Sequence, residues 1–422
     1  MQASDVVKTA GAKHAKNDRR MASIDGLRGI AALSVFAFHG WLYTMPTPDA
    51  SDRSTVGDYA VHELRLGLVL FFVLSGFLLS RPWFAAALDE RRPPDLRRYL
   101  RARLARIAPA YYLALVGSIG LLWSLSGTPG LRLPPAGELP LFFAFAQNTS
   151  PTSVMKLNPP MWSLAVEVSF YLVLPALGWL ATRLPARRRF QALIPLALLA
   201  LGFLWNWSIA GRGLGLTFSK TLAAMLPYFA LGMLAALVLH KRKPSTPARR
   251  AMISAGCAIV FADAIVKAAV PAAGVDATPL FSVTRDVFSG VGFALIIAAA
   301  AAAPTGRLLG NRVLAAMGTI SYGFYLWHVP VLMFLRGHGL LPLDPLLGTA
   351  VALGPALAVS ALSWYAVEQP VIAWAARRNE RSRVERKRRT RPAPAAARPA
   401  VASGSGGADR RAGGREVGTV RA

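Results

Sequence analysis

The chain has 422 residues, of which 54% are hydrophobic and only 16% are charged, and its mean hydropathy is +0.40. This is far more apolar side chain than a soluble domain of this size needs, which excludes an ordinary soluble protein and makes the bilayer the expected solvent. The 48 Lys and Arg against 21 Asp and Glu give a net charge of +27, so the meaning of that charge depends on where the basic residues lie.

Ten windows of mostly apolar residues have about the length that crosses 30 Å of hydrocarbon as a helix. In chain order they are 28–45, 66–88, 107–126, 161–182, 190–210, 219–240, 251–270, 287–303, 313–335 and 346–374. A shorter apolar stretch at 139–146 is expected to be re-entrant or interfacial. The sequence therefore predicts an all-α, polytopic membrane protein with about ten transmembrane helices.

The basic residues alternate between the segments that connect these windows. One set of alternate segments holds 23 Lys and Arg before the C-terminal tail, which adds 14 more, whereas the opposite set holds eight when Lys220, at the first turn of the sixth window, is counted with it. Cytoplasmic loops carry such an excess of Lys and Arg. The pattern predicts a multi-pass protein of the cytoplasmic membrane with both termini in the cytoplasm.

Three regions follow from composition. Residues 1–22 form a basic cytoplasmic N-terminal tail, 23–376 the ten-helix membrane domain, and 377–422 a tail rich in Arg, Ala, Pro and Gly. The last region has too few large apolar residues to offset the entropy of ordering, so it is predicted to be disordered, cytoplasmic and able to lie on anionic lipid headgroups. We do not expect it to bind nucleic acid.

Ionisable residues inside apolar windows are costly and mark candidate functional positions. In the first window, Arg28 and His39 are eleven residues apart, which places them on one helix face about 16 Å apart along the axis. Arg28 then lies at the cytoplasmic boundary and His39 near mid-membrane. A snorkelling anchor is the structural alternative for Arg28, and a histidine bonded to a neighbouring helix is the alternative for His39. Histidine is also the side chain best suited to take a proton from an alcohol at neutral pH.

The second window carries Ser75 and Gly76 in its middle, where small residues admit either another helix backbone or a narrow ligand chain. A basic run, DLRRYLRARLARIAP, leads into the third window. Its Arg103 and Arg106 are three residues apart, hence adjacent on a helix surface, and guanidinium groups bind phosphates bidentately. A phosphorylated donor arriving from the cytoplasm would meet them, although charge that only sets topology is the alternative.

The fourth window contains Glu167, four residues after Ser163, and the ninth contains Ser321, Tyr325 and His328 along one stripe. Estimated depths along the helices allow His39, Glu167 and His328 to meet in the outer half of one cavity. Arg28, Arg103 and Arg106 would then face the cytoplasmic mouth of that cavity. The other histidines, His62 among them, are assigned no role, and no metal site is predicted.

These residues belong to an ordered series of motifs by which the chain resembles the membrane-bound acyltransferase family 3. The motifs are DGLRGIAALSVFAFH, FFVLSGF, RRYLRARLARIAP, PPMWSLAVEVSFYLVLP, ISYGFYLWHVPV and a late VEQP, and the match covers about residues 23 to 375. Members of this family O-acylate surface polysaccharides, peptidoglycan, nodulation factors and some macrolides. The resemblance implies a ten-helix fold and acyl-coenzyme A as donor substrate, with no permanently bound cofactor.

The resemblance also assigns positions in this sequence. It implies a reactive Arg-x10-His pair at Arg28 and His39, and it places the Arg-x-x-Arg, SGF and acidic tryptophan-motif positions at Arg103, Arg106, Ser75 and Glu167. Many relatives have a second acidic residue in the tryptophan motif, where Val168 stands here. A role that needs two carboxylates is therefore in doubt.

The expected reaction is transfer of an acyl group, expected to be acetyl, to a hydroxyl of a glycan, lipid-linked sugar or macrolide. His39 would act as general base, Arg28 would fix the donor or the helix entry, and Glu167 or His328 would orient the acceptor or His39. A covalent acyl-His39 intermediate stays open. So does the side of the membrane from which the acceptor enters.

Two other classes of protein share some of these features. A transporter of a small polar or anionic solute also has ionisable residues in mid-membrane, but neither a repeat relating its halves nor a pair of broken helices is evident here. A membrane scaffold would use the polar stripes only for helix association.

Overall fold

The computed structural model describes residues 3–45, 55–127, 131–272, 284, 286–303 and 309–389, and the regular secondary structure of these residues is entirely helical. The α-helices are α1 (Ala3–Thr44), α2 (Val56–His62), α3 (Gly67–Leu88), α4 (Leu96–Leu122), α5 (Leu139–Phe143), α6 (Met161–Arg183), α7 (Arg188–Gln191), α8 (Leu193–Arg212), α9 (Leu216–Ser219), α10 (Leu222–Leu239), α11 (Thr246–Ala272), α13 (Val287–Ala302), α14 (Arg312–Gly337), α15 (Pro345–Ser363) and α16 (Gln369–Arg389). Short 3₁₀ turns occupy Glu63–Leu66 (η1), Trp123–Leu125 (η2), Ala136–Glu138 (η3) and Gln147–Thr149 (η4), and Trp364–Glu368 (η5) is π-helical.

A helix lies at each of the ten predicted windows, in the order α1, α3, α4, α6, α8, α10, α11, α13, α14 and α15. Among the described residues, seven helical segments are long and apolar enough to cross a membrane, and α13 is a shorter apolar helix. The seven are Val56–Leu88, Leu96–Leu125, Met161–Arg183, Arg188–Arg212, Leu216–Leu239, Thr246–Ala269 and Pro345–Arg381. The protein is therefore an all-helical multi-pass membrane protein, and the full count of ten crossings stays a prediction. The apolar stretch at 139–146 contains only the short helix α5.

The chain divides after Ala376 into a large compact unit and a second unit that starts at Arg377. Helix α16 continues to Arg389, so the first residues of the predicted disordered tail are helical. Residues 390–422 lie outside the described part. The basic N-terminal region is likewise helical from Ala3 on, as the first turns of α1.

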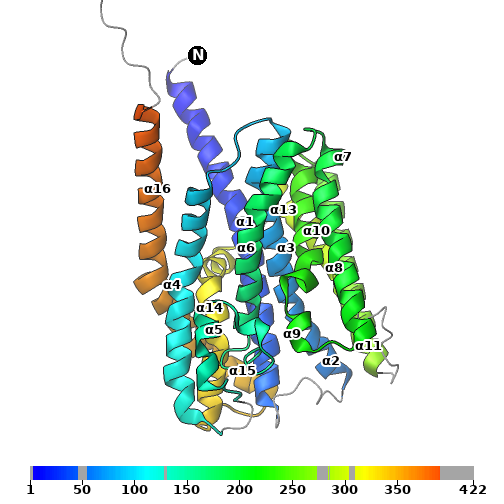
Figure 1. The fold of residues 1–422 in the computed structure, drawn as a ribbon, viewed down its shortest axis with the longest axis vertical. Coiled ribbons are helices and arrows are strands. Elements are labelled where there is room, and N and C mark those ends of the chain that lie inside the picture. The colour runs from blue at the N-terminus through cyan, green and yellow to red at the C-terminus, as the bar shows by residue number, and fades with distance from the viewer. Residues whose placement is uncertain are drawn as a thin grey trace, which may run out of the picture. The chain divides into compact units, whose positions relative to one another are not determined.

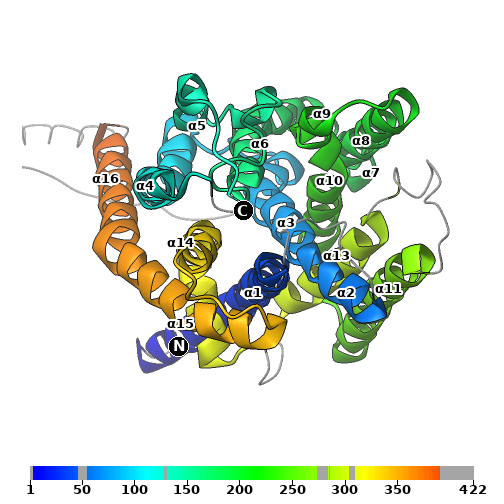
Figure 2. The same ribbon diagram turned by 90° about the horizontal axis from the view of Figure 1, so that it is seen from below.

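Glycines allow the helices at the centre of the large unit to approach closely. Helix α1 packs along α14, and α3 packs along α10 (Figures 1 and 2). A Cβ atom on Gly318 would lie 1.9 Å from the Asp25 carbonyl oxygen, and one on Gly76 would lie 2.2 Å from the Phe229 carbonyl oxygen. Small residues permit such backbone contact between membrane helices. Of the two alternatives for the SGF element, helix packing therefore accounts for Gly76.

We expect Gly318→Ala to lower the free energy of unfolding by about 1 to 3 kcal/mol, because the added methyl group must push α1 and α14 apart. Gly120→Ala in α4 is the matched control, since a Cβ there meets nothing within 4 Å. That change should be neutral or should stabilise the helix by up to about 1 kcal/mol. Thermal unfolding of the purified protein in detergent measures both, and equal stability of the two variants would contradict the packing assigned to Gly318.

At one end of the bundle, the turn after α3 is held to the turn after α10. Asp89 accepts a hydrogen bond from His240 at 3.0 Å and forms ion pairs with Lys241 and Arg91 at 2.5 and 2.9 Å. Hydrogen bonds from Lys241 and, to a smaller extent, from His240 lower the pKa of the Asp89 carboxyl group to about 2. These contacts fix the end of α3 from which the chain turns into α4.

Candidate functional site

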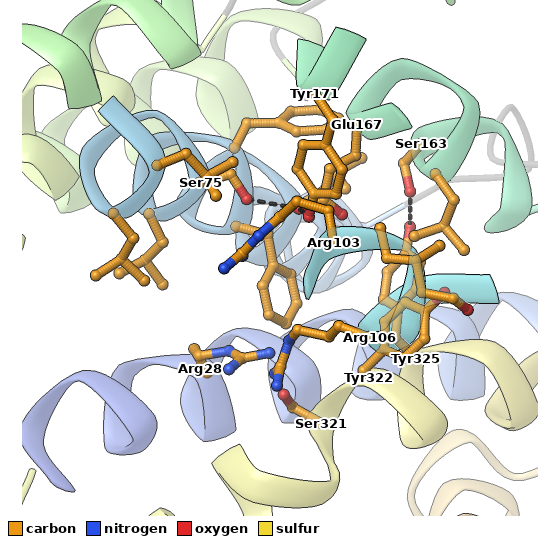
Figure 3. A pocket seen from close by; sticks show the side chains of 18 residues that line it. Arg28, Ser75, Arg103, Arg106, Ser163, Glu167, Tyr171, Ser321, Tyr322 and Tyr325 are labelled. Atoms are coloured by element: carbon orange, nitrogen blue, oxygen red, sulfur yellow. Dashed lines mark hydrogen bonds between the residues drawn. The ribbon is translucent and has the colours of Figure 1, made fainter. Parts of the chain in front are cut away.

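The first cavity has a volume of about 330 Å³ and lies among α1, α3, α4, α6 and α14. Each of these helices contributes polar side chains to its lining (Figure 3). They are Arg28, Ser75, Arg103, Arg106, Ser163, Glu167, Tyr171, Ser321, Tyr322 and Tyr325. The rest of the lining is mainly Leu and Phe, so charged groups converge in an otherwise apolar chamber.

Three arginines reach into this cavity. Arg28 comes from α1, and Arg103 and Arg106 come from neighbouring positions on α4 (Figure 3). The carboxylate of Asp25 is 4.0 Å from Arg28, and the Nε atom of Arg103 is buried with no hydrogen-bond partner among the described residues. The one acidic residue among those that line the cavity is Glu167. The predicted convergence of the three arginines is observed, and the excess positive charge suits an anionic ligand.

Glu167 is held by two hydroxyl groups. Ser75 on α3 and Tyr171 on α6 each donate a hydrogen bond of 2.8 Å to its Oε1 atom. The serine of the SGF element therefore fixes the carboxylate of the tryptophan motif across two helices (Figure 3). Together they form a polar part of the cavity lining, which the arginines of α1 and α4 share.

His39 of α1 and His328 of α14 are in direct contact, with ring centroids 5.0 Å apart. A backbone carbonyl only accepts hydrogen bonds. Hence Nδ1 of His39, at 2.9 Å from the Val35 oxygen, carries a hydrogen, as does Nδ1 of His328, at 3.1 Å from the Phe324 oxygen. In the neutral rings, Nε2 of His328 then accepts from Nδ1 of His39 at 3.1 Å. This arrangement leaves Nε2 of His39 with its lone pair.

His39 lines a second cavity of about 220 Å³. The cavity lies where α3, α6, α10 and α13 begin, at the end of the bundle opposite to the start of α1 and α4. Its other polar lining residues are His62, Arg65, Lys220 and Asp286, and its aromatic walls are Phe38, Phe72, Trp162, Tyr228 and Tyr325. The ammonium of Lys220 lies 4.2 Å above the Trp162 ring. Sequence reasoning assigned none of these four polar residues to the site.

A buried ion-pair network supports the wall of this second cavity. Arg65 donates two hydrogen bonds to Asp286, at 2.6 and 2.9 Å, and pairs with Glu63 at 3.0 Å. Lys267 of α11 bonds Asp286 at 2.9 Å and Asp263 at 2.7 Å. The network thus joins η1 to α11 and to the start of α13.

The two cavities share a wall formed by Leu68, Phe72 and Tyr325. The hydroxyl of Tyr325 is 2.7 Å from the Ser163 hydroxyl and donates to the Pro160 carbonyl at 3.2 Å. Ser163 belongs to the predicted stripe of α6 and Tyr325 to that of α14. The bonds fix Tyr325 between the arginines on one side and His39 on the other.

One predicted grouping is wrong. His39 and His328 do meet, but Glu167 lies in the first cavity with the arginines. The two cavities follow one another along α6: Trp162 at its start lines the second cavity, whereas Ser163, Glu167 and Tyr171 further along line the first. Among the described residues, no group of three His, Cys, Asp or Glu side chains could hold a metal ion.

A family model for an acyltransferase domain matches residues 21–365. The acyltransferase MdmB of Streptomyces mycarofaciens is 29% identical over 340 residues, which cover 76% of this chain and 81% of the relative.

Two further relatives are longer proteins. The peptidoglycan O-acetyltransferase OatA of Listeria monocytogenes is 24% identical, with 74% of this chain and 49% of the relative covered. The O-acetyltransferase OatA of Staphylococcus aureus is 23% identical, with 76% and 52% covered. The chain therefore spans about half the length of these two proteins. No solved structure is significantly similar to it.

Proposed function

Because the chain belongs to acyltransferase family 3 and is an enzyme that transfers acyl groups, we propose that it moves an acyl group from acyl-coenzyme A to an acceptor hydroxyl. Its acceptor would be a glycan, a lipid-linked sugar or a macrolide. The observation that carries this proposal is the placement of His39. Its ring lines the second cavity, and the wall that the two cavities share separates this ring from the three arginines of the first cavity.

The first cavity suits the donor. Coenzyme A carries phosphate groups, and Arg28, Arg103 and Arg106 supply guanidinium groups with few competing carboxylates nearby. The orphaned Nε of Arg103 is a donor that a bound ligand would satisfy. Ser75 holds Glu167 in place by a hydrogen bond, and the Glu167 carboxylate balances part of the positive charge of the three arginines.

The second cavity suits the acceptor. In the proposed reaction, Nε2 of His39 takes the proton of the acceptor hydroxyl as that oxygen attacks the thioester carbonyl carbon. A C–O bond forms, the C–S bond breaks, and the leaving thiolate recovers the proton from the imidazolium. His328 accepts the hydrogen bond from Nδ1 of His39, which orients the ring and stabilises its transient charge.

The experiment that tests this function uses membranes that contain the protein. They are incubated with acyl-labelled acetyl-coenzyme A and a panel of glycan and macrolide acceptors. Label should move to an acceptor as an ester, with release of free thiol. Release of thiol with no ester on any acceptor would contradict the proposal. Label retained on the protein without acceptor, and absent from the His39→Ala protein, would instead identify an acyl-His39 intermediate.

The proposed orientation has ten membrane crossings with both termini in the cytoplasm, which puts the arginine cavity toward the cytoplasm. It rests on the 23 basic residues of one set of loops against eight in the other. Reporter fusions after residues 50, 145 and 280 should report an extracytoplasmic position. Fusions after residues 185 and 243 are the matched controls and should report the cytoplasm. The opposite pattern would overturn the orientation.

A further inference from the structure

Helix α4 presents arginines on two opposite faces. Arg103 and Arg106 line the first cavity, whereas Arg97 and Arg101 line a separate groove. At 100° per residue, Arg97, Arg101 and Leu104 fall within about 60° of one another. Arg103 and Arg106 lie on the other side of the same helix. The basic run that precedes the third window therefore lines both the first cavity and this separate groove.

The groove lies between α4 and the first turns of α16 and has a volume of about 530 Å³. Its arginines are at one end, at the start of α4. The rest of the lining is apolar, and no described residue that lines it is acidic; it comprises Leu100, Leu104, Ala105, Ala108, Pro109, Val371 and Trp374. Leu104 is 58% exposed and Trp374 is 49% exposed, as expected of side chains that face lipid tails.

The dimensions of α4 put the arginines at headgroup level. The helical segment Leu96–Leu125 has 30 residues, so it is about 45 Å long, against about 30 Å for the hydrocarbon core. The first turns therefore extend into the polar layer of the membrane. From Arg97 to Pro109 the groove runs about 18 Å along the helix, close to the roughly 15 Å depth of one leaflet's hydrocarbon.

We propose that this groove binds an anionic phospholipid. Arg97 and Arg101 contact its phosphate, and one acyl chain lies along Leu100, Leu104 and Ala108 against Trp374. Two positive charges one helical turn apart attract a phosphate, and the absence of lining carboxylates favours an anionic over a zwitterionic headgroup. The bound lipid covers the face of α4 that is opposite to Arg103 and Arg106. The site is independent of what the two cavities bind.

The test uses the full chain in nanodiscs and the fluorescence of Trp374. Bromine atoms on lipid chains quench tryptophans that they touch, and the Trp374→Phe variant isolates the signal of this one ring. Brominated phosphatidylglycerol should quench Trp374 more strongly than brominated phosphatidylcholine at equal dilution in unbrominated lipid. The excess should disappear in an Arg97→Gln/Arg101→Gln variant.

The control is Arg92→Gln/Arg98→Gln, which removes two exposed charges from the same region without touching the groove. It should keep the excess quenching. Equal quenching by the two lipids, or loss of the excess in the control as well, would overturn the proposal. Absence of quenching by either lipid would also overturn it, because another protein surface would then cover Trp374. Arg97→Lys/Arg101→Lys keeps the charge and should retain the preference, which separates charge loss from misfolding.

Discussion

Replacing His39 with alanine is expected to lower acyl transfer by about 10² to 10⁴, the usual effect of losing a general base. The change removes Nε2 of His39, the ring nitrogen that keeps its lone pair because Nδ1 is hydrogen-bonded to the Val35 carbonyl and to His328. Folding should survive, since alanine keeps the helix and the orphaned Nε2 of His328 costs about 1 to 3 kcal/mol. The measurement is transfer of labelled acyl groups in membranes at matched protein levels.

The matched control is His338→Ala, which removes an exposed histidine at the end of α14, away from both cavities. It should leave transfer near normal. Arg28→Lys keeps the charge and so preserves topology, yet it should weaken transfer if the guanidinium binds the donor bidentately. Near-normal turnover by the His39→Ala variant would contradict the assignment of His39 as general base.

Replacing Arg65 with methionine is expected to lower the free energy of unfolding by about 3 to 5 kcal/mol, as for other broken buried ion pairs. The network around it contains Glu63, Asp263 and Asp286 against Arg65 and Lys267, so it already has one negative charge in excess. Without Arg65, Lys267 is the one positive charge left against three carboxylates, and it pairs with only two of them, Asp263 and Asp286. Thermal unfolding in detergent measures the loss.

Asp286→Asn should destabilise the protein less than Arg65→Met, because it removes the excess negative charge while keeping the side-chain shape. Arg212→Met, at the exposed end of α8, removes a positive charge at the surface and should have little effect. If Arg65→Met is as stable as Arg212→Met, the network contributes nothing to the fold.

Hydropathy alone located the helices, because a crossing segment must be apolar over a fixed length and satisfy its own backbone. The convergence of Arg28 with Arg103 and Arg106 was also predictable, since all three lie near the starts of apolar windows that begin on one side. The contact of His39 with His328 followed from matching depths. These are the features that distance along a helix determines.

The boundary between the two cavities was not predictable in this way. Glu167 lies beyond the part of α6 that lines the second cavity, and its carboxylate meets Ser75 and Tyr171 rather than His39. The division of the interior into two cavities depends on the packing of Tyr325 against Ser163. No spacing within a single window contains that information.

The residues of the second cavity that were missed lie at helix ends, where a polar side chain is unremarkable in sequence. Asp263 and Lys267, however, stand inside an apolar window, and charges in hydrocarbon require partners. That requirement predicts a further acidic partner for Lys267 close to the window 251–270, which in the structure is Asp286. His62 carries no comparable signal, because it belongs to a short segment outside the windows.

Kinetics can test directly the proposed division of the interior, with the donor in the arginine cavity and the acceptor in the histidine cavity. Met225 lines the second cavity and is not among the residues that line the first. The decisive measurement is the KM of each substrate for a Met225→Trp variant, whose larger side chain fills acceptor space. We expect a raised KM for the acceptor with an unchanged KM for acyl-coenzyme A, and a raised KM for the donor alone would contradict the division into a donor cavity and an acceptor cavity.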